Sequence, residues 1–168
     1  REEGIRDAMF WMMGSVAGAK WSQLPIPLIS LILALIILRL LARPLNLMLM
    51  GEDAAATLGV DSQRLKKWLI VLTALLTGVL VSVSGAIGFI GLMVPHMVRL
   101  VIGSNHRYVL PLSALMGAIF LIWADLITRT IVAPQELPIG IITALCGGPF
   151  FIWLLRKSSY SFGGGEEK

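Results

Sequence analysis

The 168 residues are 57% hydrophobic and only 14% charged, whereas ordinary soluble domains carry about 25% charged residues. Together with a mean hydropathy of +0.84, this composition excludes an ordinary soluble domain and indicates an integral membrane protein. The formal net charge of +4 does not indicate nucleic-acid binding, because no basic stripe with interleaved aromatic residues accompanies it. The single cysteine, Cys146, lies in an apolar block, so a packing role is expected.

Five apolar blocks follow residues 1–24, which we expect to form an exterior segment. A helix needs roughly 17 to 25 apolar residues to cross the hydrocarbon core of a bilayer, and each block is a candidate span. The blocks are Pro25 to Leu41, Trp68 to Ser84, Ile87 to Ile102, Val109 to Ile127 and Ile139 to Leu155. Only two residues separate the second block from the third, so one long bent element is an alternative there. We expect an all-α membrane protein with about five transmembrane helices in residues 25–157.

The basic residues predict the orientation, because Lys and Arg are retained on the cytoplasmic side of a membrane. If five helices alternate, the larger group falls on one side: Arg39, Arg43, Arg64, Lys66, Lys67, Arg99, Arg107, Arg156 and Lys157. The smaller group falls on the other side: Arg1, Arg6, Lys20 and Arg129. We therefore expect the N-terminus outside and a polar, flexible tail, residues 158–168, in the cytoplasm. An odd number of spans with an exterior N-terminus also suggests that upstream helices are missing from this chain.

The longest predicted cytoplasmic connection, residues 44–67, contains a short predicted helix from Glu52 to Leu58. The two acidic residues at the start of this helix interact favourably with the positive end of the helix dipole, and the glycine that follows the helix is a typical helix stop. The alanines are small, so they would let the helix approach a partner closely. The residues concerned are Gly51, Glu52, Asp53, Ala54, Ala55, Ala56 and Gly59. An amphipathic helix resting at the lipid interface is an equal alternative.

The third block combines a glycine repeat with a proline. Gly85, Gly88 and Gly91 recur every third residue, a spacing that lets helix backbones pack closely in a membrane. Pro95 is expected to bend the same span, because it lacks a backbone donor and clashes with the preceding turn. His96 has no second candidate ligand beside it, so hydrogen-bonded packing is favoured over metal or haem ligation.

Two opposite charges lie at the predicted outer end of the fourth block. Asp125 and Arg129 are four residues apart, which places them on one helix face and predicts an ion pair. An exterior position avoids most of the cost of burying a charge in the bilayer. Glu136 follows in the adjoining exterior turn, whereas His106 beside Arg107 is expected in a solvated turn on the cytoplasmic side.

Several separated motifs resemble the FecCD family of ABC importer permeases. The first is Glu-Asp-Ala-Ala-Ala-Thr-Leu-Gly, residues 52–59, which resembles the family's coupling segment with Asp53 in place of an alanine. The second is Gly-Ala-Ile-Gly-Phe-Ile-Gly-Leu-Met-Val-Pro-His-Met-Val-Arg, residues 85–99. Two later stretches agree: His106-Arg107 with Leu110-Pro111, and Glu136-Leu-Pro-Ile-Gly140 leading through Gly147, Pro149 and Phe150 to Trp153-Leu-Leu. The resemblance corresponds to the C-terminal half of a ten-helix permease.

The resemblance implies a permease subunit of an ATP-driven importer in a bacterial inner membrane, moving an iron-siderophore complex, haem or cobalamin. It implies two permeases, as a homodimer or a pair, with cytoplasmic ATPase subunits and a periplasmic or lipid-anchored substrate-binding protein. Residues 51–59 would be the ATPase-coupling element, and either Glu52 or Asp53 could be the contact. Arg129, with Glu136 nearby, would dock the binding protein, although an intrachain pair with Asp125 is equally compatible with the sequence. The residues of the substrate pathway stay unassigned.

Catalysis by this chain is not expected. The sequence contains no Gly-x-x-x-x-Gly-Lys-Ser/Thr loop, so ATP hydrolysis falls to a partner subunit. No catalytic set, metal-ligand cluster or cofactor site is evident, and membrane lipid is the remaining expected partner. The alternatives are a non-transporting half-permease scaffold, which a true start near residue 1 would favour, and a secondary transporter, which would leave the short helix unexplained.

Overall fold

The computed structural model describes residues 4, 9, 11–16, 18–131 and 137–162, with side chains described as far as residue 157. Three residues used above, Arg1, Arg6 and Glu136, lie outside this part. The described elements are all helical. They are η1 (Trp21–Gln23), α2 (Pro25–Met48), α3 (Glu52–Thr57), α4 (Ser62–Ser84), α5 (Ile90–Ile102), α6 (His106–Ile131) and α7 (Ile139–Phe162). The all-α prediction is confirmed.

Four of these helices, α2, α4, α6 and α7, are long and apolar enough to cross a membrane. The fifth predicted span differs, because α5 has 13 residues and is shorter than the roughly 17 residues that a crossing needs. It begins at Ile90, not Ile87, since Gly85 and Phe89 adopt φ angles of +67° and +66° that no α-helix contains. The chain between α4 and α5 is not helical, so the single bent element is excluded.

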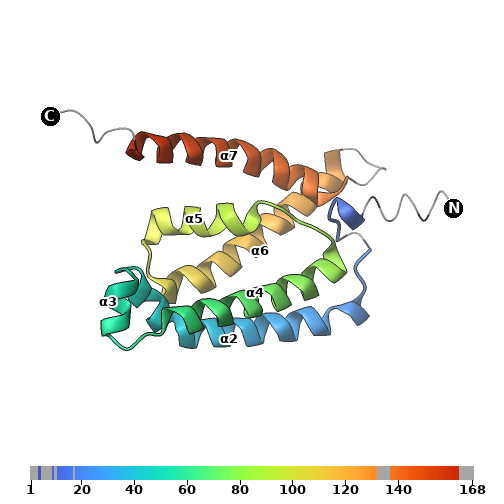
Figure 1. Cartoon of the computed structure of the whole chain (residues 1–168). Helices are drawn as coiled ribbons and strands as arrows, with labels where there is room; N and C mark the ends of the chain where they lie inside the picture. Colours follow the sequence, from blue (N-terminus) through green and yellow to red (C-terminus); the bar gives the residue numbers. More distant parts are fainter. Residues whose placement is uncertain (1–3, 5–8, 10, 17, 132–136, 163–168) are drawn as a thin grey trace.

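Successive helices reverse direction along the bundle (Figure 1). α2 runs from the N-terminal end to the end that carries α3, α4 returns, α5 runs toward α3 again, α6 returns, and α7 runs back toward the α3 end. α2 packs on α4 and α6, while α7 packs on α5 and α6. The alternation expected from the sequence is therefore present. α7 continues to Phe162, so the beginning of the predicted flexible tail, residues 158–162, is helical.

The internal core is small for a chain of this length. Its centre is Val94, Val98 and Val109, where α5 meets α6, with Ile90 and Met97 packed against it. No more than 17% of the apolar window of any of the four long helices is buried. So much uncovered apolar surface is unfavourable in water, and these helices need lipid or further protein around them.

The segment before η1 lies directly against the α4–α5 break. The Ser15 amide donates to the Ser84 carbonyl at 2.9 Å. A side chain at Gly85 would strike the Trp11 carbonyl, and one at Gly140 would strike the Met13 carbonyl. Glycines at the end of α4 and the start of α7 thus let this segment join the two helices by backbone contact.

Candidate coupling and docking sites

The predicted coupling helix is present as α3, Glu52–Thr57, one residue shorter than expected. It is flanked by Gly51 at φ +102° and Gly59 at φ +84°, conformations that favour glycine. The chain turns immediately after the helix, where the amides of Gly59 and Val60 donate to the carbonyls of Ala56 and Ala55 at 3.0 Å. A compact helical turn with a defined start and stop therefore connects α2 with α4.

The faces of α3 differ in exposure. Ala55 is 0% exposed where α3 packs on α2 and α4, so it holds the helix on the bundle and is unavailable to a partner protein. Asp53, Ala56 and Leu58 face outward. The sequence could not separate these alanines, because their identity is the same and only packing distinguishes them.

An ion pair fixes α3 to the beginning of α4. Lys66 pairs with Glu52, and Asp61 caps α4 by accepting from the Arg64 amide at 3.0 Å. Glu52 is therefore engaged within the chain. Among the residues that the structure describes, Asp53 has no hydrogen-bond or ion-pair partner. Of the two acidic residues, Glu52 has a partner within the chain and Asp53 has none among the described residues.

A polar cluster that the sequence did not reveal joins the end of α2 to the start of α6. The Asn46 amide group donates to Asn105 Oδ1 at 2.8 Å. Asn46 Oδ1 accepts from the His106 backbone amide at 2.8 Å and lies 3.0 Å from His106 Nδ1. Asn105 Oδ1 also accepts from the Arg107 amide at 3.0 Å. These bonds satisfy the first amides of α6, which have no partner within the helix.

We call Asn46, Asn105 and His106 the asparagine clamp. His106 does not lie in the solvated turn expected from the sequence, because it is half-buried against Asn46. The two asparagines are 59 residues apart in the chain, and neither lies in a motif, so nothing in the local sequence predicts their contact. The clamp holds the helix that leads into α3 against the beginning of α6.

The predicted pair at the other end of α6 is confirmed. Arg129 Nε donates to Asp125 Oδ2 at 2.8 Å, with the two side chains 45% and 27% exposed. The buried Thr128 hydroxyl donates to the Asp125 carbonyl at 2.8 Å. The pair belongs to the last turns of α6, and this end of α6 lies at the bundle end opposite α3 (Figure 1).

The predicted packing of helix backbones at the three glycines stays a prediction, because Gly85 and Gly88 lie outside the described helices. Gly85 makes the close backbone contact with Trp11, but a side chain at Gly88 or Gly91 would meet no described atom within 4 Å. Close packing at those two glycines stays a prediction about other segments. Pro95 lies inside α5, and its bending effect is also still a prediction.

An aromatic contact series connects α5 with α7. His96 lies edge-on to Phe150 with the ring centroids 5.7 Å apart, and Phe150 is 5.8 Å from Trp153. Lys157 Nζ lies 5.4 Å from the Trp153 ring centroid, a favourable cation–π distance. His96 thus has a packing partner. No group of three metal-ligating side chains occurs among the described residues.

Comparison with known proteins identifies the lineage of this architecture. The model of the FecCD transport family matches residues 1–157. The Hemin transport system permease protein HmuU of Yersinia pestis is 49% identical over 157 residues, covering 93% of this chain and 47% of that protein. The Fe(3+) dicitrate transport system permease protein FecD of Escherichia coli is 42% identical, covering 94% of this chain and 49% of that protein.

A solved structure agrees with the sequence relatives. A metal-chelate type ABC transporter in an inward-facing conformation superimposes with a TM-score of 0.84 at 37% identity, covering 93% of this chain and 50% of that one. The chain thus spans about half the length of the relatives it matches. On the family match, which extends over nearly the whole sequence, the chain belongs to the FecCD transport family.

Proposed function

We propose that the four membrane-length helices and the shorter α5 of this chain form part of the permease subunit of an ATP-binding-cassette importer in a bacterial inner membrane. The observation that supports this most strongly is the family match over residues 1–157, together with relatives named as hemin, cobalamin and Fe(3+) dicitrate permeases. Those cargoes are all metal complexes, so a metal chelate, with iron-siderophore first, is the proposed cargo class. Two permease copies or a permease pair would enclose the pathway.

The α3 end is the proposed contact for a cytoplasmic ATPase. α3 is seated on two long helices through the buried Ala55 and is tied to α4 by the Glu52–Lys66 pair. A displacement of α3 by a bound ATPase would therefore be transmitted to α2 and α4. Asp53 projects from the exposed surface of α3 and is the proposed contact residue within 51–59.

The opposite end is the proposed dock for a periplasmic or lipid-anchored substrate-binding protein. Arg129 is already oriented there by Asp125, so its contact with an acidic partner would cost little side-chain entropy. Glu136 follows Arg129 by seven residues in the sequence and is proposed as part of the same surface. In this orientation the N-terminus is exterior and the C-terminus cytoplasmic.

The test is ATPase activity in liposomes that contain the full-length permease and its cognate ATPase, with and without binding protein. Asp53→Ala is expected to reduce permease-dependent stimulation of the ATPase. Gln63→Ala is the matched control, because Gln63 is an exposed polar residue on the first turn of α4. Assembly of each complex is verified first by size-exclusion chromatography.

Arg129→Glu is expected to lose stimulation by the binding protein while basal ATPase activity stays unchanged. Lys20→Glu, a charge reversal at the same end of the bundle, is the control and should retain stimulation. If Asp53→Ala and Arg129→Glu both behave as wild type, the two site assignments fail and a non-transporting scaffold becomes the better explanation. Uptake of a radiolabelled iron complex by the same liposomes separates transport from scaffolding.

A further inference from the structure

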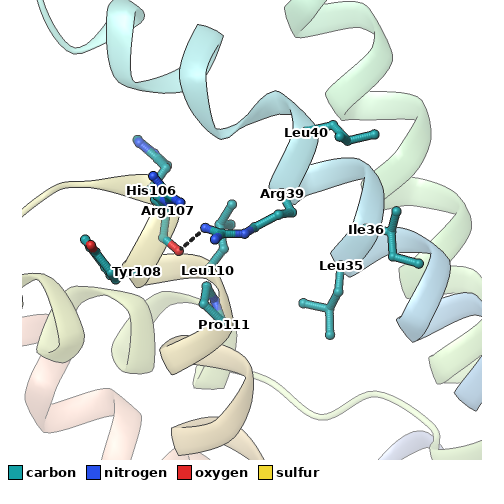
Figure 2. A pocket seen from close by; sticks show the side chains of 9 residues that line it. All are labelled: Leu35, Ile36, Arg39, Leu40, His106, Arg107, Tyr108, Leu110 and Pro111. Carbon is teal, nitrogen blue, oxygen red and sulfur yellow. Dashed lines mark hydrogen bonds between the residues drawn. The ribbon is translucent and has the colours of Figure 1, made fainter.

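Two adjoining hollows lie between α2 and the first turns of α6. The first, of about 550 Å³, is mainly apolar, and its lining includes Leu35, Ile36, Leu110 and Pro111. Figure 2 shows these side chains on the two helices, with Arg39 reaching across to the Arg107 carbonyl. The second hollow, of about 460 Å³, is more polar, and both share Arg39, Leu40 and Arg107. We call the pair the arginine groove.

The polar part of the groove carries positive charge without a balancing carboxylate. Arg39, Arg43 and Arg107 all line it. In the described part of the chain none of the three forms an ion pair, since the carboxylates that do so pair with Arg64, Lys66 and Arg129. Three like charges at close quarters repel one another, so an anion bound among them would be stabilised.

The geometry suits a phosphate group in particular. Arg39 and Arg43 are four residues apart on α2 and therefore share one helix face. Arg39 Nη1 is held by the Arg107 carbonyl at 3.1 Å, which restrains the guanidinium without neutralising it. Guanidinium groups bind phosphate through paired hydrogen bonds, and arginine is favoured where such planar recognition is needed.

The apolar part of the groove distinguishes a lipid from a free anion. It begins beside Arg39 and continues along α2 toward Leu35, into the apolar block that crosses the membrane. Ile36 and Leu40 are 53% and 74% exposed, so no described segment covers the apolar part of the groove. An amphiphile with a phosphate headgroup and a hydrocarbon chain matches this order of polar and apolar lining, and basic pockets between membrane helices bind such lipids.

We propose that the arginine groove binds one anionic phospholipid, with its phosphate among Arg39, Arg43 and Arg107 and an acyl chain beside Leu35 and Pro111. The lipid would bridge α2 and α6 next to the asparagine clamp. It would therefore strengthen the connection between the base of α3 and the start of α6.

The test uses the full-length permease in detergent, with bound lipid counted by native mass spectrometry during titration with phosphatidylglycerol or phosphatidylcholine. Wild type is expected to bind one phosphatidylglycerol more tightly than phosphatidylcholine. Arg43→Gln should weaken phosphatidylglycerol binding about fivefold, the effect of one arginine near an anionic membrane surface. Arg43 makes no hydrogen bond or ion pair within the described residues, so this variant should fold normally.

Two controls make the result decisive. Arg156→Gln removes an exposed arginine from α7, outside the groove, and should leave phosphatidylglycerol binding unchanged. If Arg156→Gln weakens binding as much as Arg43→Gln does, the lipid is attracted by general surface charge and the proposed site is refuted. Leu35→Trp should fill the apolar part and reduce lipid binding while the arginines remain. Displacement of the lipid by millimolar inorganic phosphate would also refute the proposal. Equal binding of phosphatidylglycerol and phosphatidylcholine by wild type would refute it too, and this is the result expected if another protein segment covers the groove.

Discussion

Replacement of Asn46 by alanine is expected to release the beginning of α6 from the end of α2. The side chain makes three polar contacts, two with His106 and one with Asn105, at 2.8 to 3.0 Å. Each hydrogen bond contributes about 1 kcal/mol net, and allowing for partial exposure the loss is about 2 kcal/mol. That free energy corresponds to about a thirtyfold change in a local opening equilibrium.

Hydrogen exchange followed by mass spectrometry on the full-length permease measures this opening directly. Peptides containing the first turn of α6 should exchange about thirtyfold faster in Asn46→Ala, whereas peptides from the middle of α4 should not change. Asn46→Asp keeps the acceptor for the His106 amide but loses the donor to Asn105, so its effect should be smaller. Asn105→Ala should produce a similar acceleration, and the effect of the double variant should be smaller than the sum of the two single effects, because each single variant already loses the Asn46–Asn105 bond. Unchanged exchange at α6 in Asn46→Ala would refute the clamp.

Two further predictions use matched glycines. Gly59→Ala should destabilise the permease by about 1 to 2 kcal/mol, because φ is +84° there and a left-handed conformation is unfavourable for alanine. The control is Gly78→Ala, in the interior of α4 with no atom within 4 Å of the added side chain. This variant should have an equal or higher temperature of thermal unfolding. Gly147→Ala should lower the unfolding temperature, because the added side chain would overlap the Phe89 ring and overpacking costs about 1 to 3 kcal/mol. Gly148→Ala should leave the unfolding temperature unchanged, because the added side chain would meet no atom within 4 Å. Equal unfolding temperatures within either pair would contradict the corresponding argument.

Hydropathy and local sequence signals were sufficient to predict the long helices and α3. Four apolar blocks became membrane-length helices, and the acidic start and glycine stop of α3 were placed within one residue. These features depend on residues that are close in sequence, where helix periodicity and capping operate.

The start of α5 and the asparagine clamp depend on distant residues and were therefore missed. Apolar residues can be helical or extended inside a membrane protein, and hydropathy does not distinguish the two. Phe89 adopts a positive φ with its ring packed where Gly147 has no side chain, a contact across 58 residues. The Asn46–Asn105 bond likewise joins separate helices. Both features require the tertiary packing to be known first.

α6 is one continuous helix from His106 to Ile131, so a rotation near one end displaces the other end. At 1.5 Å per residue its 26 residues span about 39 Å, from the clamped His106 to the turn beyond Arg129. Pro111 lies about one turn and a half from the clamped end, and a proline inside a helix is a common site of a kink. A tilt of about 5° at that pivot would displace the far end by roughly 3 Å, by the same helix length. A small change of angle near the clamped end would thus become a larger displacement at the end of the helix that carries Arg129.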